Sequence, residues 1–341
     1  MLISSYCITI IYSYFFLSHS VDDIFYFGPA VNLFENGKYA LSVGDKIFTV
    51  FYLFPAFSLF NGFFLEVTNI LSFPIDHLSY RLFSKIIILF LFFSIIHYVN
   101  RLNNGSIAAE NLAIVILMTS PFMLGSVGSV RPEPLGVLLV CWSLILFFYW
   151  QKRSKAKNLF LSNFFLGLAC ITHPIFIIPS ILISSYMLAS SFKSCGTILM
   201  LKSFLILVFP FTCYLIWLIC NFDQAYIELS NRVINSNSGF LNILLQNLNI
   251  NIFSILSSFE TSLTTAIYRF YFSYPFHMLL VLVILNLLTN SSRIKNPELI
   301  FGLVGTIINF IFIPHYDFHY ALLVFFTICI AASLFYERIK D

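Results

Sequence analysis

The sequence predicts an all-α polytopic membrane protein with about ten transmembrane helices and a long first outer loop that carries interfacial or re-entrant helices. Three observations support this fold class. Hydrophobic residues make up 59% of the 341 residues and charged residues only 10%, whereas a soluble domain carries roughly 25% charged residues. The mean hydropathy is +0.91. Apolar stretches long enough to cross a ~30 Å hydrocarbon core recur along the whole chain.

Ten apolar stretches are expected to form the membrane spans of a single domain that covers residues 1–341. The first lacks a basic region and a cleavage site, so we expect it to be retained as a span. Two short stretches in the middle are separated by Thr172-His173-Pro174, and one long helix kinked at Pro174 is the alternative. The stretches cover residues 3–18, 80–99, 107–128, 134–150, 159–172, 174–190, 203–220, 271–289, 298–314 and 320–336.

The apolar segment 47–72 is expected to be partly embedded and re-entrant on the outer side, because Pro55, Asn61-Gly62 and Glu66 interrupt it. A full crossing is the alternative. The basic residues favour the first interpretation, since without this crossing their clusters all fall on one side, as the positive-inside rule requires. These residues are Arg101, Lys152, Arg153, Lys155, Lys157, Lys193, Lys202, Arg293, Lys295, Arg338 and Lys340.

This distribution predicts an integral protein of the bacterial inner membrane with both termini in the cytoplasm. Two long loops, residues 19–79 and 221–270, would then lie on the outer face. The net charge of +3 is too small to predict a nucleic-acid partner. Membrane lipid is the expected surrounding.

The first outer loop opens with two adjacent carboxylates, Asp22 and Asp23, directly after the first span. Ionisable groups this close to hydrocarbon are costly, about 2.5–3.5 kcal/mol each at mid-depth, so they tend to mark function. The residues 27–39 are expected to form a short amphipathic surface helix that ends at Asn36-Gly37. The structural alternative is that the two carboxylates only cap this helix.

The other isolated polar residues also face outward in this topology and predict a shared cavity at the outer membrane surface. Each has a structural alternative: a local ion pair for the Arg-Glu pair, a helix cap for the first histidine, and interfacial anchoring for the remaining histidines and tyrosine. These residues are Arg131 and Glu133 between two spans, His173 at a helix end, and His315, His319 and Tyr320 before the last span.

The chemistry that suits such a cavity is the transfer of a group from a lipid phosphate. Asp22 or Asp23 could take the proton of an attacking hydroxyl as a general base. Arg131 and the three histidines could stabilise negative charge on a departing phosphate, while Glu133 orients Arg131 or the acceptor. The outer loops contain enough carboxylates for a divalent metal, but no ligand spacing predicts a metal site, so the metal is left open.

These motifs resemble those of GT-C fold glycosyltransferases. The run Asp22-Asp23-x-x-Tyr26-x-x-x-Ala30-x-x-Leu33-x-x-x-Gly37-x-Tyr39 is similar to the first outer loop of the bacterial dolichyl-phosphate-mannose protein mannosyltransferase-like and aminoarabinose transferase-like enzymes, of the glycosyltransferase 39/83 type. Four further matches follow in family order. They are Pro55 with Tyr80-Arg81-Leu82, Val130-Arg131-Pro132-Glu133-Pro134-Leu135, Gly167-Leu168-Ala169-x-x-Thr172-His173-Pro174, and His315-x-x-x-His319-Tyr320.

The resemblance covers residues 1–190 best and the last thirty residues loosely. Three positions depart from the family pattern: Glu133 stands for an aspartate, His173 for a common lysine or arginine, and His319 for an arginine.

The resemblance implies a membrane glycosyltransferase that moves a sugar from a polyprenyl-phosphate donor to an envelope glycan, lipid or protein acceptor on the outer face, with inversion at C1. Asp22, or else Asp23, would be the base. The donor-phosphate and substrate-binding residues would be Arg131, Glu133, His173, His315, His319 and Tyr320.

Two other functions remain as alternatives. A lipid-linked-sugar flippase or transporter is disfavoured because no repeat is visible and the ionisable groups gather at one surface instead of the midplane. An envelope polysaccharide polymerase or ligase is disfavoured because the second long outer loop carries only Arg232 and Arg269.

Overall fold

The computed structural model describes residues 21–37, 39–43, 46–49, 55–71, 77–120, 131–223, 283, 296–312 and 316–340, and the structural statements below concern these residues. The span predicted over residues 3–18 lies outside them, as does the span over 271–289 apart from residue 283.

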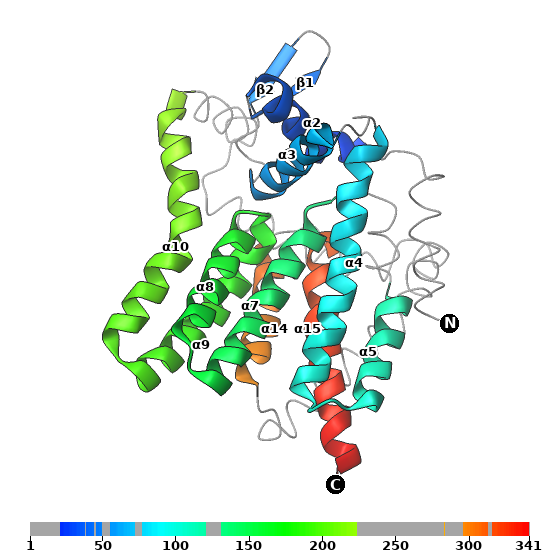
Figure 1. Ribbon diagram of the computed structural model, residues 1–341, viewed down its shortest axis with the longest axis vertical. Coiled ribbons are helices and arrows are strands. Elements are labelled where there is room, and N and C mark those ends of the chain that lie inside the picture. Colours follow the sequence, from blue (N-terminus) through cyan, green and yellow to red (C-terminus); the bar gives the residue numbers. More distant parts are fainter. Residues whose placement is uncertain are drawn as a thin grey trace.

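The described helices form a bundle whose members run up and down in succession (Figure 1). Four of them are long and apolar enough to cross a membrane, and three shorter apolar helices accompany these four. The predicted all-α polytopic architecture is therefore confirmed. The bundle consists of α4 (His77–Leu102), α5 (Ile107–Thr119), α7 (Glu133–Arg153), α8 (Ala156–Cys170), α9 (Ile177–Cys195), α10 (Thr197–Cys220), α14 (Pro297–Phe312) and α15 (Tyr316–Lys340).

The turn between α8 and α9 shows that the predicted spans 159–172 and 174–190 are two separate antiparallel helices, and the single kinked helix is wrong (Figure 1). His173 has an extended backbone, with φ −160° and ψ 145°, and the 3₁₀ turn η1 (Pro174–Phe176) follows it. An extended residue before proline cannot continue an α-helix, because the proline ring excludes the helical conformation there.

The connection between α9 and α10 is much shorter than the sequence predicts, because the helices extend through Lys193 and Lys202. Only Gly196 separates them, with φ at 82°, and its N–H donates to the Phe192 carbonyl at 3.0 Å. A glycine in this left-handed region is a common way to end a helix.

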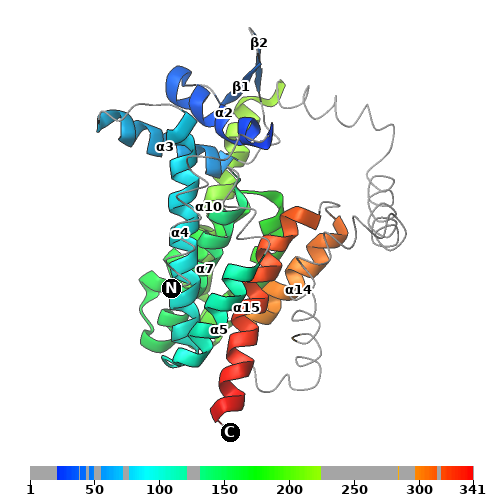
Figure 2. The ribbon, with the colours of Figure 1, turned by 90° about the vertical axis from the view of Figure 1, so that its right-hand side faces the viewer.

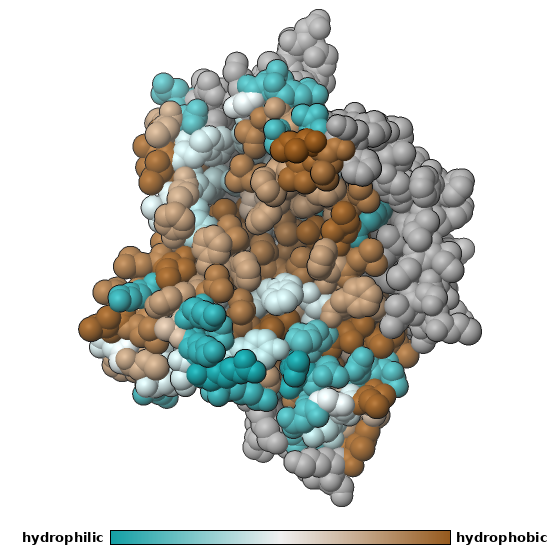
Figure 3. Space-filling model, viewed as in Figure 1, coloured by the Kyte–Doolittle hydropathy of each residue, from teal (hydrophilic) through white to brown (hydrophobic). Residues whose placement is uncertain are grey.

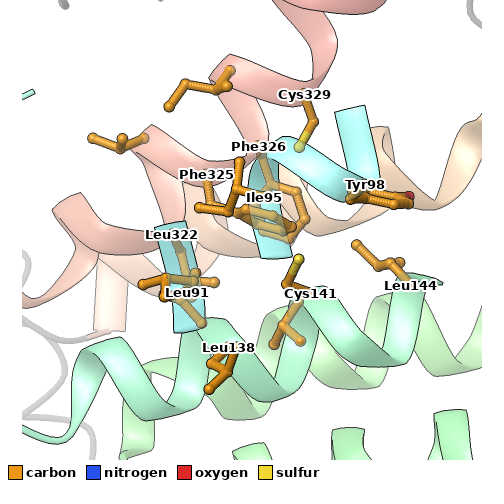
Figure 4. Close-up of a cluster of buried hydrophobic side chains, with 14 of the residues drawn as sticks. Leu91, Ile95, Tyr98, Leu138, Cys141, Leu144, Leu322, Phe325, Phe326 and Cys329 are labelled. Atoms are coloured by element: carbon orange, nitrogen blue, oxygen red, sulfur yellow. The ribbon is translucent and has the colours of Figure 1, made fainter. Parts of the chain in front are cut away.

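The core lies where α4, α7 and α15 meet (Figure 4). Tyr98 of α4 stacks on Phe325 of α15, with ring centroids 6.4 Å apart. Helix α14 packs closely on the same element, because a Cβ at Gly302 would lie 2.3 Å from the Phe326 ring. The other core residues drawn are Leu91, Ile95, Leu138, Cys141, Leu144, Leu322 and Cys329.

Basic side chains gather at one end of the bundle, where α7 meets α8 and α9 meets α10. Figure 3 shows hydrophilic residues along this end and a hydrophobic belt above it. The Lys152 ammonium lies 4.3 Å from the centre of the Phe148 ring, a cation–π contact at the edge of the belt. This arrangement is the one that the sequence predicts for the inner side of the membrane. We call the opposite end of the bundle the outer end.

A separate layer covers the outer end and consists of α2 (Val21–Asn36), β1 (Ala40–Val43), β2 (Lys46–Thr49) and α3 (Pro55–Ile70). Figures 1 and 2 show α3 lying across the bundle instead of along it, in agreement with the prediction that segment 47–72 does not cross. We call these four elements the outer layer.

Two features of the outer layer differ from the sequence-based expectation. Helix α2 already includes Val21, whereas the sequence predicts a helix over 27–39; its end at Asn36, before Gly37 with φ 64°, agrees with the prediction. The antiparallel pair β1–β2, in which Ala40 faces Thr49, is an addition to the all-α prediction. Branched and aromatic residues on both sides of a Gly-Asp pair were the signal for it.

Candidate active site at the outer end of the bundle

Helices α2 and α3 pack tightly on each other in the outer layer. A Cβ at Gly62 of α3 would meet the Ala30 carbonyl oxygen at 3.6 Å and the Leu33 side chain at 3.9 Å, which are ordinary van der Waals distances. The Asn32 amide donates to the Ala40 carbonyl at 2.7 Å and joins α2 to β1. The described elements of the outer layer therefore pack together as one unit.

Contacts with several helices hold the outer layer on the bundle. The Ala56 N–H donates to the Ile171 carbonyl at 3.0 Å, which joins the start of α3 to the turn after α8. Tyr39 meets Trp217 of α10 edge-on, with ring centroids 5.4 Å apart. Phe57 contacts Phe83 of α4 at 5.7 Å. The layer therefore touches several helices around the outer end.

The two predicted base residues, Asp22 and Asp23, lie in the first turn of α2. The structure places their backbone within the outer layer. Their side chains lie outside the described part of the structure. Acidic residues are favoured in a first helical turn, so the capping interpretation and the base interpretation both stay predictions.

Arg131 and Glu133 form an ion pair at the start of α7, with Arg131 Nη2 3.1 Å from Glu133 Oε1. The Glu133 side chain is only 4% exposed, while Arg131 is 24% exposed. A buried carboxylate paired with a more accessible guanidinium keeps the cation oriented. The local ion pair given above as the structural alternative is therefore present, with the arginine as its accessible member, and the phosphate-binding role stays a prediction.

His173 caps the 3₁₀ turn η1. The Ile175 N–H donates to its Nδ1 at 3.4 Å, which is the helix-cap role given above as the structural alternative. A second bond fixes this turn from another part of the chain, because the buried Asn309 amide of α14 donates to the Ile175 carbonyl at 2.7 Å. The histidine therefore sits on a rigid turn.

The structure brings the Arg131–Glu133 turn and the His173 turn together. Gly136 lies one helical turn after Glu133, and a Cβ there would be 2.2 Å from the ring of Phe176. Phe176 is the last residue of η1, which begins directly after His173. Two motifs that are 40 residues apart in the sequence therefore lie side by side at the outer end.

The last predicted motif is only partly described. His319 and Tyr320 lie in the first turn of α15, which begins at Tyr316, and their side chains lie outside the described part. His315 itself also lies outside it. The first turn of α15 is at the same end of the bundle as the starts of α7 and α9 (Figure 1).

Lys85 is a candidate that the sequence analysis missed. It lies in the span Leu82–Leu102 of α4 and is only 4% exposed. It is three residues from the outer end of that span, so roughly 4.5 Å in depth at 1.5 Å per residue. A buried cation in a membrane span is a functional candidate, because burying the charge is costly. The signal was a lysine inside an otherwise apolar run.

Among the residues that the structure describes, no group of three histidine, cysteine, aspartate or glutamate side chains is placed to hold a metal ion.

Comparison with solved structures identifies the architecture. The chain superposes on ArnT from Cupriavidus metallidurans, an aminoarabinose transferase, with a TM-score of 0.66 for the form bound to undecaprenyl phosphate and 0.65 for the apo form. The chain has the GT-C fold. The sequence identities are 12% and 11%, and 98% of this chain is covered in both cases.

The match covers 59% and 58% of the two ArnT chains, so this chain spans about three fifths of their length. No protein-family model matches the chain, and no curated protein matches its sequence. The likeness therefore concerns the fold, and it agrees with the family that the sequence motifs resemble.

Proposed function

We propose that the protein is a membrane glycosyltransferase that moves a sugar from a polyprenyl-phosphate donor to an envelope glycan, lipid or protein on the outer face of the bacterial inner membrane. The observation that carries the proposal is the outer end of a GT-C bundle, where the Arg131–Glu133 pair and the His173 turn lie side by side. The apolar belt below them provides the surroundings that a polyprenyl tail needs.

The reaction assigns one role to each group. Asp22, or Asp23, accepts the proton of the acceptor hydroxyl. The oxygen of that hydroxyl forms a bond to C1 of the sugar. The bond between C1 and the phosphate oxygen breaks, and configuration at C1 inverts. The electron pair stays on the departing polyprenyl phosphate, whose charge is stabilised by Arg131 and the histidines of the outer end.

Lys85 adds a second cation to the groups that would stabilise the phosphate charge. Lys85 is buried near the outer end of α4, three residues inside the span Leu82–Leu102. A compact cation in a low-dielectric site interacts strongly with a phosphate. We therefore assign Lys85 to the donor phosphate, together with Arg131.

The test is sugar transfer in membranes that contain Asp22→Asn or Asp23→Asn at matched protein level. Asparagine keeps the size of the side chain and removes the base, so we expect one variant to lose transfer by about 10²–10⁴-fold. Glu35→Gln is the matched control, because Glu35 is an exposed carboxylate of the same helix, and it should transfer normally. Normal transfer by both aspartate variants would contradict the proposal and favour a lipid-linked-sugar flippase or a polymerase.

A further inference from the structure

Asn61 of α3 is a completely buried amide whose side chain has no hydrogen bond to the residues that the structure describes. Its exposed fraction is 0%, and neither Nδ2 nor Oδ1 has a partner within the described part of the chain. Buried amides are almost always paired, because an unpaired one loses its bonds to water without replacement. An apolar residue of similar size would make a more stable interface, so the amide needs an explanation beyond folding.

Asn61 faces the part of α4 that carries the buried lysine. Phe57 and Phe64 precede and follow Asn61 by four and three residues, so the three side chains share one face of α3. Both rings contact Phe83 of α4, with centroids 5.7 and 5.5 Å apart. Phe83 directly precedes Ser84 and Lys85, which are 1% and 4% exposed.

We propose that Asn61 binds hydroxyl groups of the sugar carried by the lipid donor. An amide offers two donors and an acceptor on one rigid group, which matches a pair of sugar hydroxyls, each of which both donates and accepts. A phosphate offers acceptors only, and Lys85 already supplies a cation at this level. This assignment rests on the proposed function, because it takes the donor to be a polyprenyl-phosphate sugar.

The Asn61 amide is buried beneath the outer layer to which α3 belongs. The sugar therefore reaches it when α3 moves away from the bundle. Within the described part of the chain, no hydrogen bond of the Asn61 side chain has to be broken in this movement, which lowers its cost. The start of α3 is held by the bond from the Ala56 N–H to the Ile171 carbonyl. The sugar then gives the amide the partners that it lacks in the closed position.

The experiment compares Asn61→Leu with Thr68→Val in the full-length protein. Thr68 is a matched control, since it is buried in the same helix but its hydroxyl is satisfied by the Leu65 carbonyl at 2.8 Å. The probes are undecaprenyl phosphate and undecaprenyl phosphates that carry a hexose, an N-acetylhexosamine or an aminopentose. Their binding is followed by the rise in melting temperature, and transfer by KM and kcat. Asn61→Ala replaces the leucine variant if leucine does not fit.

We expect Asn61→Leu to raise the melting temperature of the ligand-free protein, to leave binding of sugar-free undecaprenyl phosphate unchanged, and to weaken binding of the cognate lipid-linked sugar by about tenfold to a hundredfold. Thr68→Val should change neither affinity. Equal affinity of Asn61→Leu and wild type for the lipid-linked sugar would overturn the inference, as would equal loss for both lipids. The proposed function is tested separately, by the transfer activity of the aspartate variants. A failure of the sugar-binding inference can therefore be distinguished from a failure of the proposed function.

Discussion

Gly136 has no side chain, and the ring of the buried Phe176 occupies the space that one would need. This single contact seats the start of α7 against the turn that carries His173. A change at Gly136 therefore tests whether the two motifs are held together as the structure shows.

We expect Gly136→Ala to destabilise the protein. Alanine is intrinsically better than glycine inside a helix by about 1 kcal/mol, whereas overpacking a buried contact costs about 1–3 kcal/mol. Because the added Cβ would lie only 2.2 Å from the Phe176 ring, the cost of overpacking should exceed the gain in helix propensity. The melting temperature should therefore fall. Gly62→Ala is the control, because its Cβ would meet the nearest atom at an ordinary 3.6 Å and the variant should be neutral or more stable. A Gly136→Ala protein as stable as wild type would show that Phe176 moves freely.

At the level of single residues, the sequence identified Arg131, Glu133 and His173 as site candidates and missed Lys85 and Asn61. Arg131, Glu133 and His173 were found because a charged or titratable residue next to proline between apolar runs is conspicuous. Lys85 and Asn61 lie inside apolar runs, and their burial depends on how α3 and α4 meet. No local sequence pattern predicts how these two helices pack against each other.

At the level of elements, α14 fixes a turn that lies far from it in the sequence. The bond from the Asn309 amide to the Ile175 carbonyl joins residues 134 apart, and both side chains are buried. The turn that carries His173 therefore depends on α14, a helix that comes much later in the sequence.

Asn309→Leu should leave the buried Ile175 carbonyl without its partner and destabilise the protein by about 1–3 kcal/mol. If the His173 turn belongs to the active site, transfer should fall as well at a temperature where the variant is folded. Asn221→Leu is the matched control, because the amide of this residue, which caps α10, donates to the Trp217 carbonyl one turn earlier at 2.8 Å. Thermal unfolding and transfer assays check both effects. An unchanged melting temperature for Asn309→Leu would contradict the structural role of this bond.

The helices themselves were largely predictable, since an apolar run of spanning length has few other ways to satisfy its backbone in a membrane. The helix boundaries were less predictable. Helices α9 and α10 extend into the basic segment between the predicted spans, because Gly196 alone makes the turn between them. The β1–β2 pair was missed because two four-residue strands give a weak pattern next to a strong apolar one.

For the whole molecule, the placement of the basic residues at one end predicts its orientation in the membrane. In intact cells, a membrane-impermeant maleimide should label Glu66→Cys in the outer layer and leave Lys155→Cys unlabelled until the membrane is opened. Both positions are exposed, so accessibility within the protein does not limit the reaction. The wild type, which has its own exposed Cys195, gives the background. Labelling of Lys155→Cys in intact cells would reverse the assigned orientation.

The central position of α15 has a consequence for how the protein is made. Every residue from Ala321 to Ala332 is buried, and α15 packs against α4, α5, α7 and α14. All four of these helices precede it in the chain, so they are synthesised and inserted first. Until α15 arrives, the core faces of α4 and α7 lack the helix that joins them. Completion of the bundle is therefore a late event in biogenesis, and a nascent chain stopped before residue 316 carries inserted helices without a finished interior.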